Sequence, residues 1–257
     1  MKINGHIEYS RPYPSPNKDV SLLEITYWSE DALVKGLLAI PKCEATEGIL
    51  YLRGGIQSVG MVRPARIAEI ACEGMVVFAP YYRGNRGGQG KDEFVGIDRY
   101  DAVNGVDVLK QFVKGAIHVF SFSRGGIMAL WMGILRSDIA SIVTWGGVSD
   151  LLLTYEERVD MRRMMKRVVG SPQKYPHIYE KRTPLHRIQE ISCPVCIIHG
   201  KQDDHVSFEH ATRLAAALER QQKHVETWFY EQYTHYFPMK INHEVVRKAC
   251  EWMKKQK

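Results

Sequence analysis

Short apolar runs alternate with longer amphipathic stretches from Gly48 to the end of the sequence. Several runs, such as residues 75–79, are apolar at consecutive positions, which is typical of parallel strands covered by helices on both faces. The expected strands are 49–52, 75–79, 117–120, 142–145, 195–199 and 226–230. The expected crossover helices are 64–72, 99–112, 124–135, 208–220 and 243–254. This alternation predicts an α/β fold with a mostly parallel central sheet flanked by helices.

Two further β-rich segments, 22–28 and 33–40, precede this alternation and predict an antiparallel opening pair, giving about eight strands. Prolines at positions 12, 14 and 16 indicate an extended lead-in before them. Residues 149–190 interrupt the alternation with a charged, methionine-rich, proline-containing stretch, which we interpret as a short cap over the carboxyl edge of the sheet. We expect one domain over residues 1–257.

Composition excludes several classes of protein. Of 257 residues, 45% are hydrophobic and 25% are charged, which disfavours disordered, collagenous and coiled-coil chains. No apolar run approaches the ~20 residues that span a bilayer, and the amino terminus lacks a secretory signal, so we expect a complete, soluble, cytoplasmic protein with no membrane partner. The net charge of +6 comes without a nucleic-acid motif, so no nucleic-acid partner is assigned.

The segment 119–126, Val-Phe-Ser-Phe-Ser-Arg-Gly-Gly, joins a predicted strand to a predicted helix through small residues. A nucleophile elbow has this pattern because its serine occupies a strained turn that leaves no room for bulky neighbours. Ser123 is the candidate nucleophile. Most such motifs read GxSxG, and here Ser121 replaces the first glycine.

A serine hydroxyl needs a histidine to remove its proton and a carboxylate to orient that histidine. Asp203 follows the predicted strand 195–199, and His235 follows the predicted strand 226–230. The order Ser123, Asp203, His235 is the order of an α/β-hydrolase triad. Asp204 is the rival acid, because it is adjacent in the same loop.

An acyl-transfer site also needs two amides that stabilise the developing oxyanion. The amide of Arg124, directly after the nucleophile, is the first candidate. Gly55 and Ile56, in the loop after strand 49–52, are candidates for the second, since small residues allow close approach of the backbone.

These residues resemble the catalytic domain of the prolyl oligopeptidase family, including its acylaminoacyl-peptidase-like members. The matching motifs are Arg53-Gly54-Gly55, residues 82–88 (Tyr-Arg-Gly-Asn-Arg-Gly-Gly), the elbow at 123–126, Thr183-Pro184-Leu185, residues 199–203 and His235. The resemblance implies an α/β-hydrolase fold, assigns the triad roles to Ser123, Asp203 and His235, and implies no cofactor.

The chain departs from the family at three points. Ser121 stands at the usual glycine, and the large amino-terminal propeller of many family peptidases is absent from this sequence. Arg53 stands where the family usually has histidine or tyrosine, so it is a candidate to donate to the oxyanion, bind a substrate carboxylate or bind a structural carbonyl. Together with Tyr82 it is a candidate substrate-binding residue.

Other polar features have less specific interpretations. The spacing Cys193-Pro194-Val195-Cys196 occurs in metal and redox sites, but it enters a buried strand without a second ligand pair, so these are expected to be structural thiols and no metal is assigned. Asp92 and Glu93 are expected to be a solvated acidic pair, with binding of a substrate amine as the alternative. Residues 158–168 have the spacing of an amphipathic helix.

The leading hypothesis is a serine hydrolase that cleaves peptide, aminoacyl-amide or ester bonds of small substrates or short peptides through an acyl-enzyme. A carboxylesterase acting on small acyl esters is the first alternative. A noncatalytic binding protein on the same fold is the alternative from another class, because fold alone does not establish function. A homodimer formed through an exposed apolar face of the cap is a further hypothesis.

Overall fold

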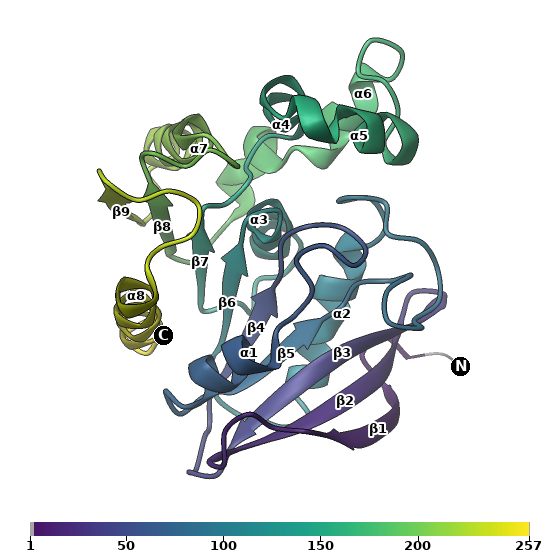
Figure 1. The fold of residues 1–257 in the computed structure, drawn as a ribbon, viewed down its shortest axis with the longest axis vertical. Coiled ribbons are helices and arrows are strands. Elements are labelled where there is room, and N and C mark those ends of the chain that lie inside the picture. Colours follow the sequence, from purple (N-terminus) through teal and green to yellow (C-terminus); the bar gives the residue numbers. More distant parts are fainter. Residues whose placement is uncertain (1–2, 257) are drawn as a thin grey trace.

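The computed structural model describes residues 3–256, which form one nine-stranded sheet with the order β1-β2-β3-β5-β4-β6-β7-β8-β9 (Figure 1). The first three strands and the β3–β5 pair are antiparallel, and every pairing from β5 onward is parallel. The strands are β1 Ile7–Tyr13, β2 Val20–Ser29, β3 Ala32–Pro41, β4 Gly48–Leu52, β5 Val76–Pro80, β6 Ile117–Phe122, β7 Ser141–Trp145, β8 Val195–Gly200 and β9 Val225–Tyr230. The expected mostly parallel α/β sheet is confirmed.

The strand absent from the sequence prediction is β1, where prolines indicated only an extended lead-in. It pairs with β2 alone and so forms one edge of the sheet, with Pro12 opposite Leu23. Proline lacks an N–H, and an edge strand tolerates this because one side of the strand has no neighbour to bond. This explains why there are nine strands rather than eight.

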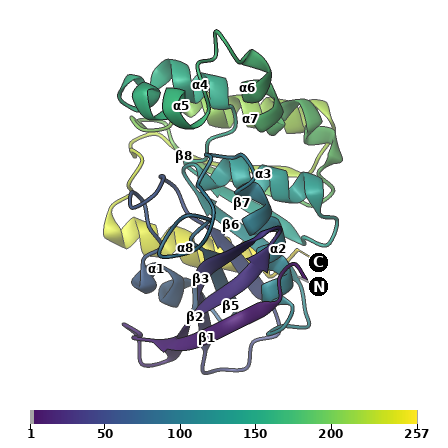
Figure 2. The same cartoon turned by 90° about the vertical axis from the view of Figure 1, so that its right-hand side faces the viewer.

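Helices cover both faces of the sheet (Figures 1 and 2). Buried side chains of α2, α3 and α7 pack in one apolar cluster, and those of α1 and α8 pack in the other. Along β4, Leu50 and Leu52 belong to the first cluster, whereas Ile49 and Tyr51 belong to the second. This is why residues 49–52 of β4 are apolar at every position. The helices are α1 Pro64–Ala71, α2 Arg99–Leu109, α3 Gly125–Leu135, α7 Phe208–Arg220 and α8 Met239–Met253.

Between β7 and β8 the chain leaves the sheet and forms α4 Leu151–Glu157, α5 Arg162–Val168 and α6 Pro176–Arg182, with short 3₁₀ turns at Val159–Met161 and Pro184–Glu190. Figure 2 shows α4, α5 and α6 together above the carboxyl ends of the central strands. Of residues 158–168, which have the spacing of an amphipathic helix, only Arg162–Val168 form an α-helix. Val159–Met161 is a 3₁₀ turn, and Arg158 has a φ of −95° and a ψ of 75°, which are not helical. Within the described residues, no helix combines the length and apolarity needed to cross a bilayer.

One buried histidine lies in the middle of the sheet. His118, near the start of β6, is fully buried, and its Nδ1 lies 2.8 Å from the Ser141 hydroxyl of β7. Burial lowers the pKa of the His118 imidazole to about 4. In the unfolded chain the His118 imidazole is therefore protonated near the ordinary histidine pKa. In the folded chain it is protonated only at a lower pH.

We predict that this difference weakens the fold in acid. Because the folded pKa is depressed, the stability that His118 contributes is complete above the unfolded pKa and is lost as the pH falls toward about 4. Between pH 7 and pH 5 the wild-type protein should lose about 2 kcal/mol more of its free energy of unfolding than His118→Gln, as measured by denaturant titration. Equal losses in the two proteins would contradict this assignment.

Candidate active site

Ser123 lies at the turn between β6 and α3, with a φ of 57° in the left-handed region that non-glycine residues rarely adopt. Three backbone hydrogen bonds fix this turn. The Ser123 amide donates to the Trp145 carbonyl at 3.1 Å, and the Ser123 carbonyl accepts from the amides of Gly126 (2.9 Å) and Val148 (3.0 Å). The side chain lines a cavity of about 750 Å³.

The residues around this turn are small because backbone and side chains approach one another closely here. A Cβ added at Gly54 would lie 2.7 Å from the Ser123 Cβ, and one at Gly126 would lie 2.6 Å from the Gly147 Cα. Ser121, at the position usually held by glycine, is completely buried and donates its hydroxyl to the Val143 carbonyl at 2.9 Å. A serine therefore fits here, because its hydroxyl has a partner in the neighbouring strand β7.

Asp203 and His235 meet across the ends of β8 and β9. The Asp203 Oδ2 lies 2.7 Å from the His235 Nδ1, and both side chains are buried. The other carboxylate oxygen accepts from the amides of His205 (2.9 Å) and Val206 (2.8 Å). Burial by itself would raise the pKa of the Asp203 carboxyl, but hydrogen bonds from His199 and His235 outweigh it and hold that pKa well below its usual range. Asp203 is thus held ionised and aligned with His235.

The rival acid, Asp204, has a different partner. Its side chain is exposed, and its Oδ1 lies 2.8 Å from the Nδ1 of His205, not from His235. The His205 ring stacks on the His235 ring with 5.0 Å between ring centroids and 5° between planes. The phenyl ring of Phe122 also packs against His235, at 4.7 Å between centroids.

Ser123 and His235 line the same cavity, together with Gly54, Gly55 and Ile56. The structure therefore brings the predicted nucleophile and the predicted base into one compartment, with the predicted acid hydrogen-bonded to the base. Gly55 and Ile56, predicted as sources of the second oxyanion amide, lie in this wall, and Gly55 has a φ of 65° that favours glycine.

Gly146 belongs to this site although the sequence analysis did not single it out. It follows β7 with a φ of 51°, and a Cβ there would lie 3.1 Å from the His235 Nδ1 and 3.2 Å from the Asp203 Oδ2. A side chain at this position would press on the hydrogen-bonded pair. The Gly146-Gly147 dipeptide after an apolar strand is the sequence signal that could have indicated it.

Arg53 and Tyr82, predicted as substrate-binding residues, are buried. Arg53 is 1% exposed, and its guanidinium donates to the carbonyls of Gly54 (2.9 Å), Val59 (3.1 Å) and Tyr81 (3.0 Å). Tyr82 is completely buried. Neither is among the described residues that line the cavity. Of the three roles expected for Arg53, the structure shows the binding of structural carbonyls. These hydrogen bonds hold the loop that contains Gly54 and Gly55.

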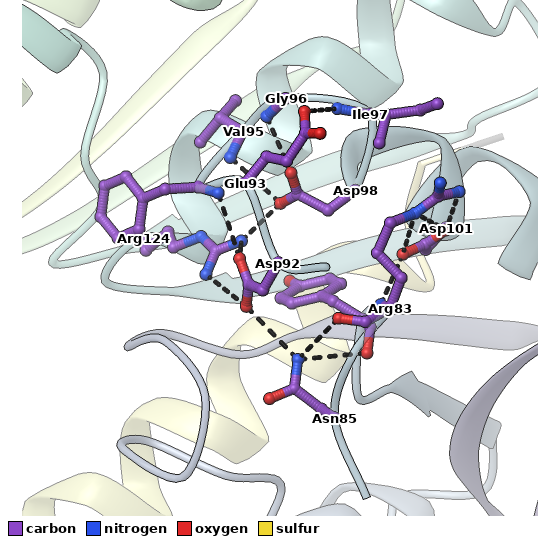
Figure 3. A network of polar contacts seen from close by, with 12 residues as sticks. Arg83, Asn85, Asp92, Glu93, Val95, Gly96, Ile97, Asp98, Asp101 and Arg124 are labelled. Carbon is purple, nitrogen blue, oxygen red and sulfur yellow. Dashed lines mark hydrogen bonds and ion pairs between the residues drawn. The ribbon is translucent and has the colours of Figure 1, made fainter. Parts of the chain in front are cut away.

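The side chain of Arg124 anchors the elbow to the loop before α2 (Figure 3). It is 2% exposed and pairs with both oxygens of Asp92 (3.0 and 2.8 Å) and with the Asp98 Oδ2 (2.5 Å), while its Nη1 donates to the Gly55 carbonyl (2.8 Å). Burial alone would raise the pKa of the Asp92 carboxyl, but the charge and hydrogen bonds of Arg124 lower it below its usual value. One guanidinium thus joins the nucleophile turn, the 92–98 loop and the Gly54-Gly55 loop.

This network corrects the prediction of a solvated acidic pair at Asp92 and Glu93. The Asp92 side chain is 2% exposed and is the ion-pair partner of Arg124. The Glu93 Oε2 accepts from the Ile97 amide at 3.1 Å, and the Glu93 carbonyl accepts from the Arg182 guanidinium. Neither carboxylate lines the cavity among the described residues, so the alternative of binding a substrate amine has no support here.

No metal is assigned by these contacts. Among residues 3–256, the one group of metal-ligating side chains close enough together is Asp203, Asp204 and His205, and both oxygens of Asp203 already accept hydrogen bonds. Cys193 and Cys196 are buried free thiols, and burial raises the pKa of Cys193 to about 11.

Residues 62–257 match the model of the prolyl oligopeptidase family. The chain is also 51% identical over 250 residues to the uncharacterized peptidase YtmA of Bacillus subtilis (strain 168), covering 95% of this chain and 97% of that one. The chain therefore belongs to the prolyl oligopeptidase family and is a peptidase-like serine hydrolase.

Solved structures give the fold. The Pyrococcus horikoshii acylaminoacyl peptidase superposes with a TM-score of 0.81 at 17% identity over 94% of this chain, which spans only 42% of that protein. An acetyl xylan esterase from Paenibacillus sp. R4 superposes with a TM-score of 0.75 at 15% identity, covering 96% of this chain and 89% of the esterase. The fold is that of the α/β-hydrolases.

We predict that Arg124→Met lowers the free energy of unfolding by about 3–5 kcal/mol, because it leaves the buried Asp98 without its cation and Asp92 with only the longer contact to Arg53, at 3.8 Å. Denaturant titration measures this loss. Arg163→Met, which removes an exposed arginine of α5, is the matched control and should change stability by less than about 0.5 kcal/mol. The triple variant R124M/D92N/D98N should recover part of the loss. A loss for R124M no larger than the control's would contradict the role assigned to the network.

Proposed function

We propose that the protein hydrolyses amide and ester bonds of small substrates, with Ser123 as nucleophile, His235 as general base and Asp203 as the group that orients His235. The observation that carries this proposal is the hydrogen bond of Asp203 to the Nδ1 of His235, on a cavity that Ser123 also lines. Because the carboxylate accepts a hydrogen bond from the Nδ1–H group, the Nε2 of neutral His235 is left as an acceptor for the serine proton.

In the proposed reaction, Ser123 Oγ adds to the substrate carbonyl carbon while His235 takes the hydroxyl proton. The Arg124 amide, with an amide from Gly55 or Ile56, stabilises the resulting oxyanion. The imidazolium then gives its proton to the leaving amine or alcohol, and an acyl-enzyme remains. Water, deprotonated by His235, hydrolyses this ester and regenerates Ser123. No cofactor takes part in these steps.

Family membership favours peptide or aminoacyl-amide bonds, and the relative named a peptidase supports this choice. The structural likeness to an acetyl xylan esterase favours a second candidate, a carboxylesterase that acts on small acyl esters. The cavity of about 750 Å³ lies within the usual range for pockets that bind small ligands, so we propose small or short-peptide substrates for either activity.

We predict that a fluorophosphonate probe labels the protein stoichiometrically and that Ser123→Ala abolishes the labelling. Ser121→Ala is the matched control, because Ser121 is a buried serine two residues away whose hydroxyl already has a partner. Intact-mass spectrometry measures the adduct. Folded wild-type protein that takes no label would favour the noncatalytic binding protein.

A second pair of variants tests whether Asp203 is the carboxylate that orients His235. Asp203→Asn should lower kcat by about 10⁴-fold, because the amide favours the wrong tautomer of His235. Asp204→Asn, one residue away and exposed, should change kcat less than about threefold. Steady-state kinetics on a small aryl ester measure both effects. If the two substitutions had equal effects, Asp203 would not be the orienting group.

Matched acyl esters and aminoacyl amides separate the two candidate activities. We expect hydrolysis of both, since both pass through the same acyl-enzyme, and the quantity to compare is kcat/KM for each pair. Turnover of esters with no cleavage of any matched amide would reject the peptidase and leave the carboxylesterase.

A further inference from the structure

The cavity beside Ser123 has apolar walls and few charged side chains. Its charged residues, apart from histidines, are Arg63, Arg124, Arg158 and Asp160. Two of the three arginines have anionic partners. Arg124 pairs with Asp92 and Asp98. Arg158 forms a bidentate ion pair with Asp160, in which its Nε and Nη2 lie 2.9 and 2.8 Å from the two carboxylate oxygens.

The third guanidinium nitrogen of Arg158 is also hydrogen-bonded, because its Nη1 donates to the His205 carbonyl at 2.8 Å. Arg158 therefore serves to join the cap to the loop that carries Asp203. Both carboxylate oxygens of Asp160 accept hydrogen bonds from Arg158. Neither residue offers a free charge to a substrate.

Arg63 is the exception among these cations. It is exposed, it lines the cavity, and its side chain has no hydrogen bond or ion pair with any residue that the structure describes. The next arginine along the chain, Arg66, is paired with Glu69 at 2.9 Å. A single positive charge thus faces the cavity without a compensating anion among residues 3–256.

The backbone of Arg63 is fixed at the start of α1. The residue precedes Pro64, at the start of α1, and has the extended φ of −93° and ψ of 122° that a following proline favours. Its carbonyl accepts from the amides of Arg66 (3.0 Å) and Ile67 (3.3 Å). Arg63 ends the same loop that begins at Arg53 and supplies Gly54, Gly55 and Ile56 to the cavity wall.

We propose that Arg63 is the specificity-determining residue of this site and that it binds a carboxylate on the substrate, away from the scissile bond. The planar guanidinium donates two parallel hydrogen bonds to a carboxylate, which a neutral group cannot accept in the same way. The apolar wall contacts the rest of the substrate through side chains that include Met61, Phe94 and Met164. The proposal rests on the proposed hydrolase function.

A carboxylate can reach Arg63 from either side of the scissile bond. On the leaving-group side, it is the free carboxylate of an N-acyl amino acid. On the acyl side, it is the second carboxylate of a dicarboxylic half-ester. Both sources share the chemistry that Arg63 recognises, and the experiment distinguishes them with two pairs of matched substrates.

The first pair is N-acetyl-L-phenylalanine and N-acetyl-L-phenylalaninamide, and the second is p-nitrophenyl hydrogen glutarate and p-nitrophenyl valerate. We expect the carboxylate member of one pair to have the higher kcat/KM. Arg63→Gln should lower the ratio of kcat/KM for the carboxylate substrate to kcat/KM for the neutral substrate about 10-fold. Arg63→Lys should lower this ratio less, because a lysine keeps the charge but cannot make the bidentate hydrogen bonds. The preference should also weaken as salt is added.

Arg163→Gln is the matched control. Arg163 is an exposed arginine of the cap that does not line the cavity in the described part of the chain, so its removal changes the net charge equally and should leave both ratios unchanged. Ratios that Arg63→Gln leaves unchanged in both pairs would overturn the proposal, as would an equal change in Arg163→Gln. The pair whose ratio responds identifies the side that carries the carboxylate.

A binding measurement separates failure of this proposal from failure of the hydrolase function. Calorimetric titration of Ser123→Ala protein with N-acetyl-L-phenylalanine and with glutarate should show binding of one of them that weakens about 10-fold when Arg63→Gln is added. If no substrate is turned over but this loss is seen, the hydrolase function fails and the carboxylate site stands. If turnover is seen without any effect of Arg63, the function stands and the carboxylate site fails.

Discussion

The left-handed backbone of Ser123 is the constraint on which the rest of the site depends. A non-glycine residue in this conformation costs of order 1–3 kcal/mol unless its surroundings enforce it. Here the enforcement comes from both neighbouring strands, because β4 ends in the loop with Gly54 and β7 supplies the Trp145 carbonyl. The glycines that crowd this turn are the condition for placing a serine hydroxyl above the sheet.

Arg124 extends this constraint outward. Burying a cation with two carboxylates is favourable only when the groups are well paired. Both terminal nitrogens of Arg124 bond to Asp92, Asp98 or the Gly55 carbonyl, whereas its Nε has no partner among the described residues. The amide of Arg124 and the loop at Gly55 are the proposed sources of the oxyanion donors. Its side chain thus ties together the two backbone segments whose spacing the proposed chemistry requires.

The sequence predicted what is local or follows from chain order. Asp203 and His235 could be placed because each follows a predicted strand and the order matches a known triad, whereas the distance between the two side chains follows only from the folded structure. β1 was missed because Pro12 within it, and Pro14 and Pro16 directly after it, argue against a strand, and its place at the sheet edge is what accommodates Pro12.

Buried polar residues could not be predicted for a different reason. Arg53 and Asp92 look like surface residues in a sequence, since nothing local shows that a guanidinium will bind three backbone carbonyls or that a carboxylate will meet an arginine 32 residues away. The same reasoning missed Gly146, whose small size matters only because Asp203 and His235 meet beside it.

The contact between Arg158 and the His205 carbonyl has a thermal consequence. It attaches the cap to the segment that orients Asp203, since the His205 amide donates to that carboxylate. The cap packs buried side chains such as Leu151, Tyr155 and Met165 on the core, but it lies outside the nine-stranded sheet, and such peripheral segments open locally at a lower free energy than core strands. On the proposed mechanism, warming would therefore release the orienting carboxylate while the core is still intact, so that heat inactivation precedes loss of β structure.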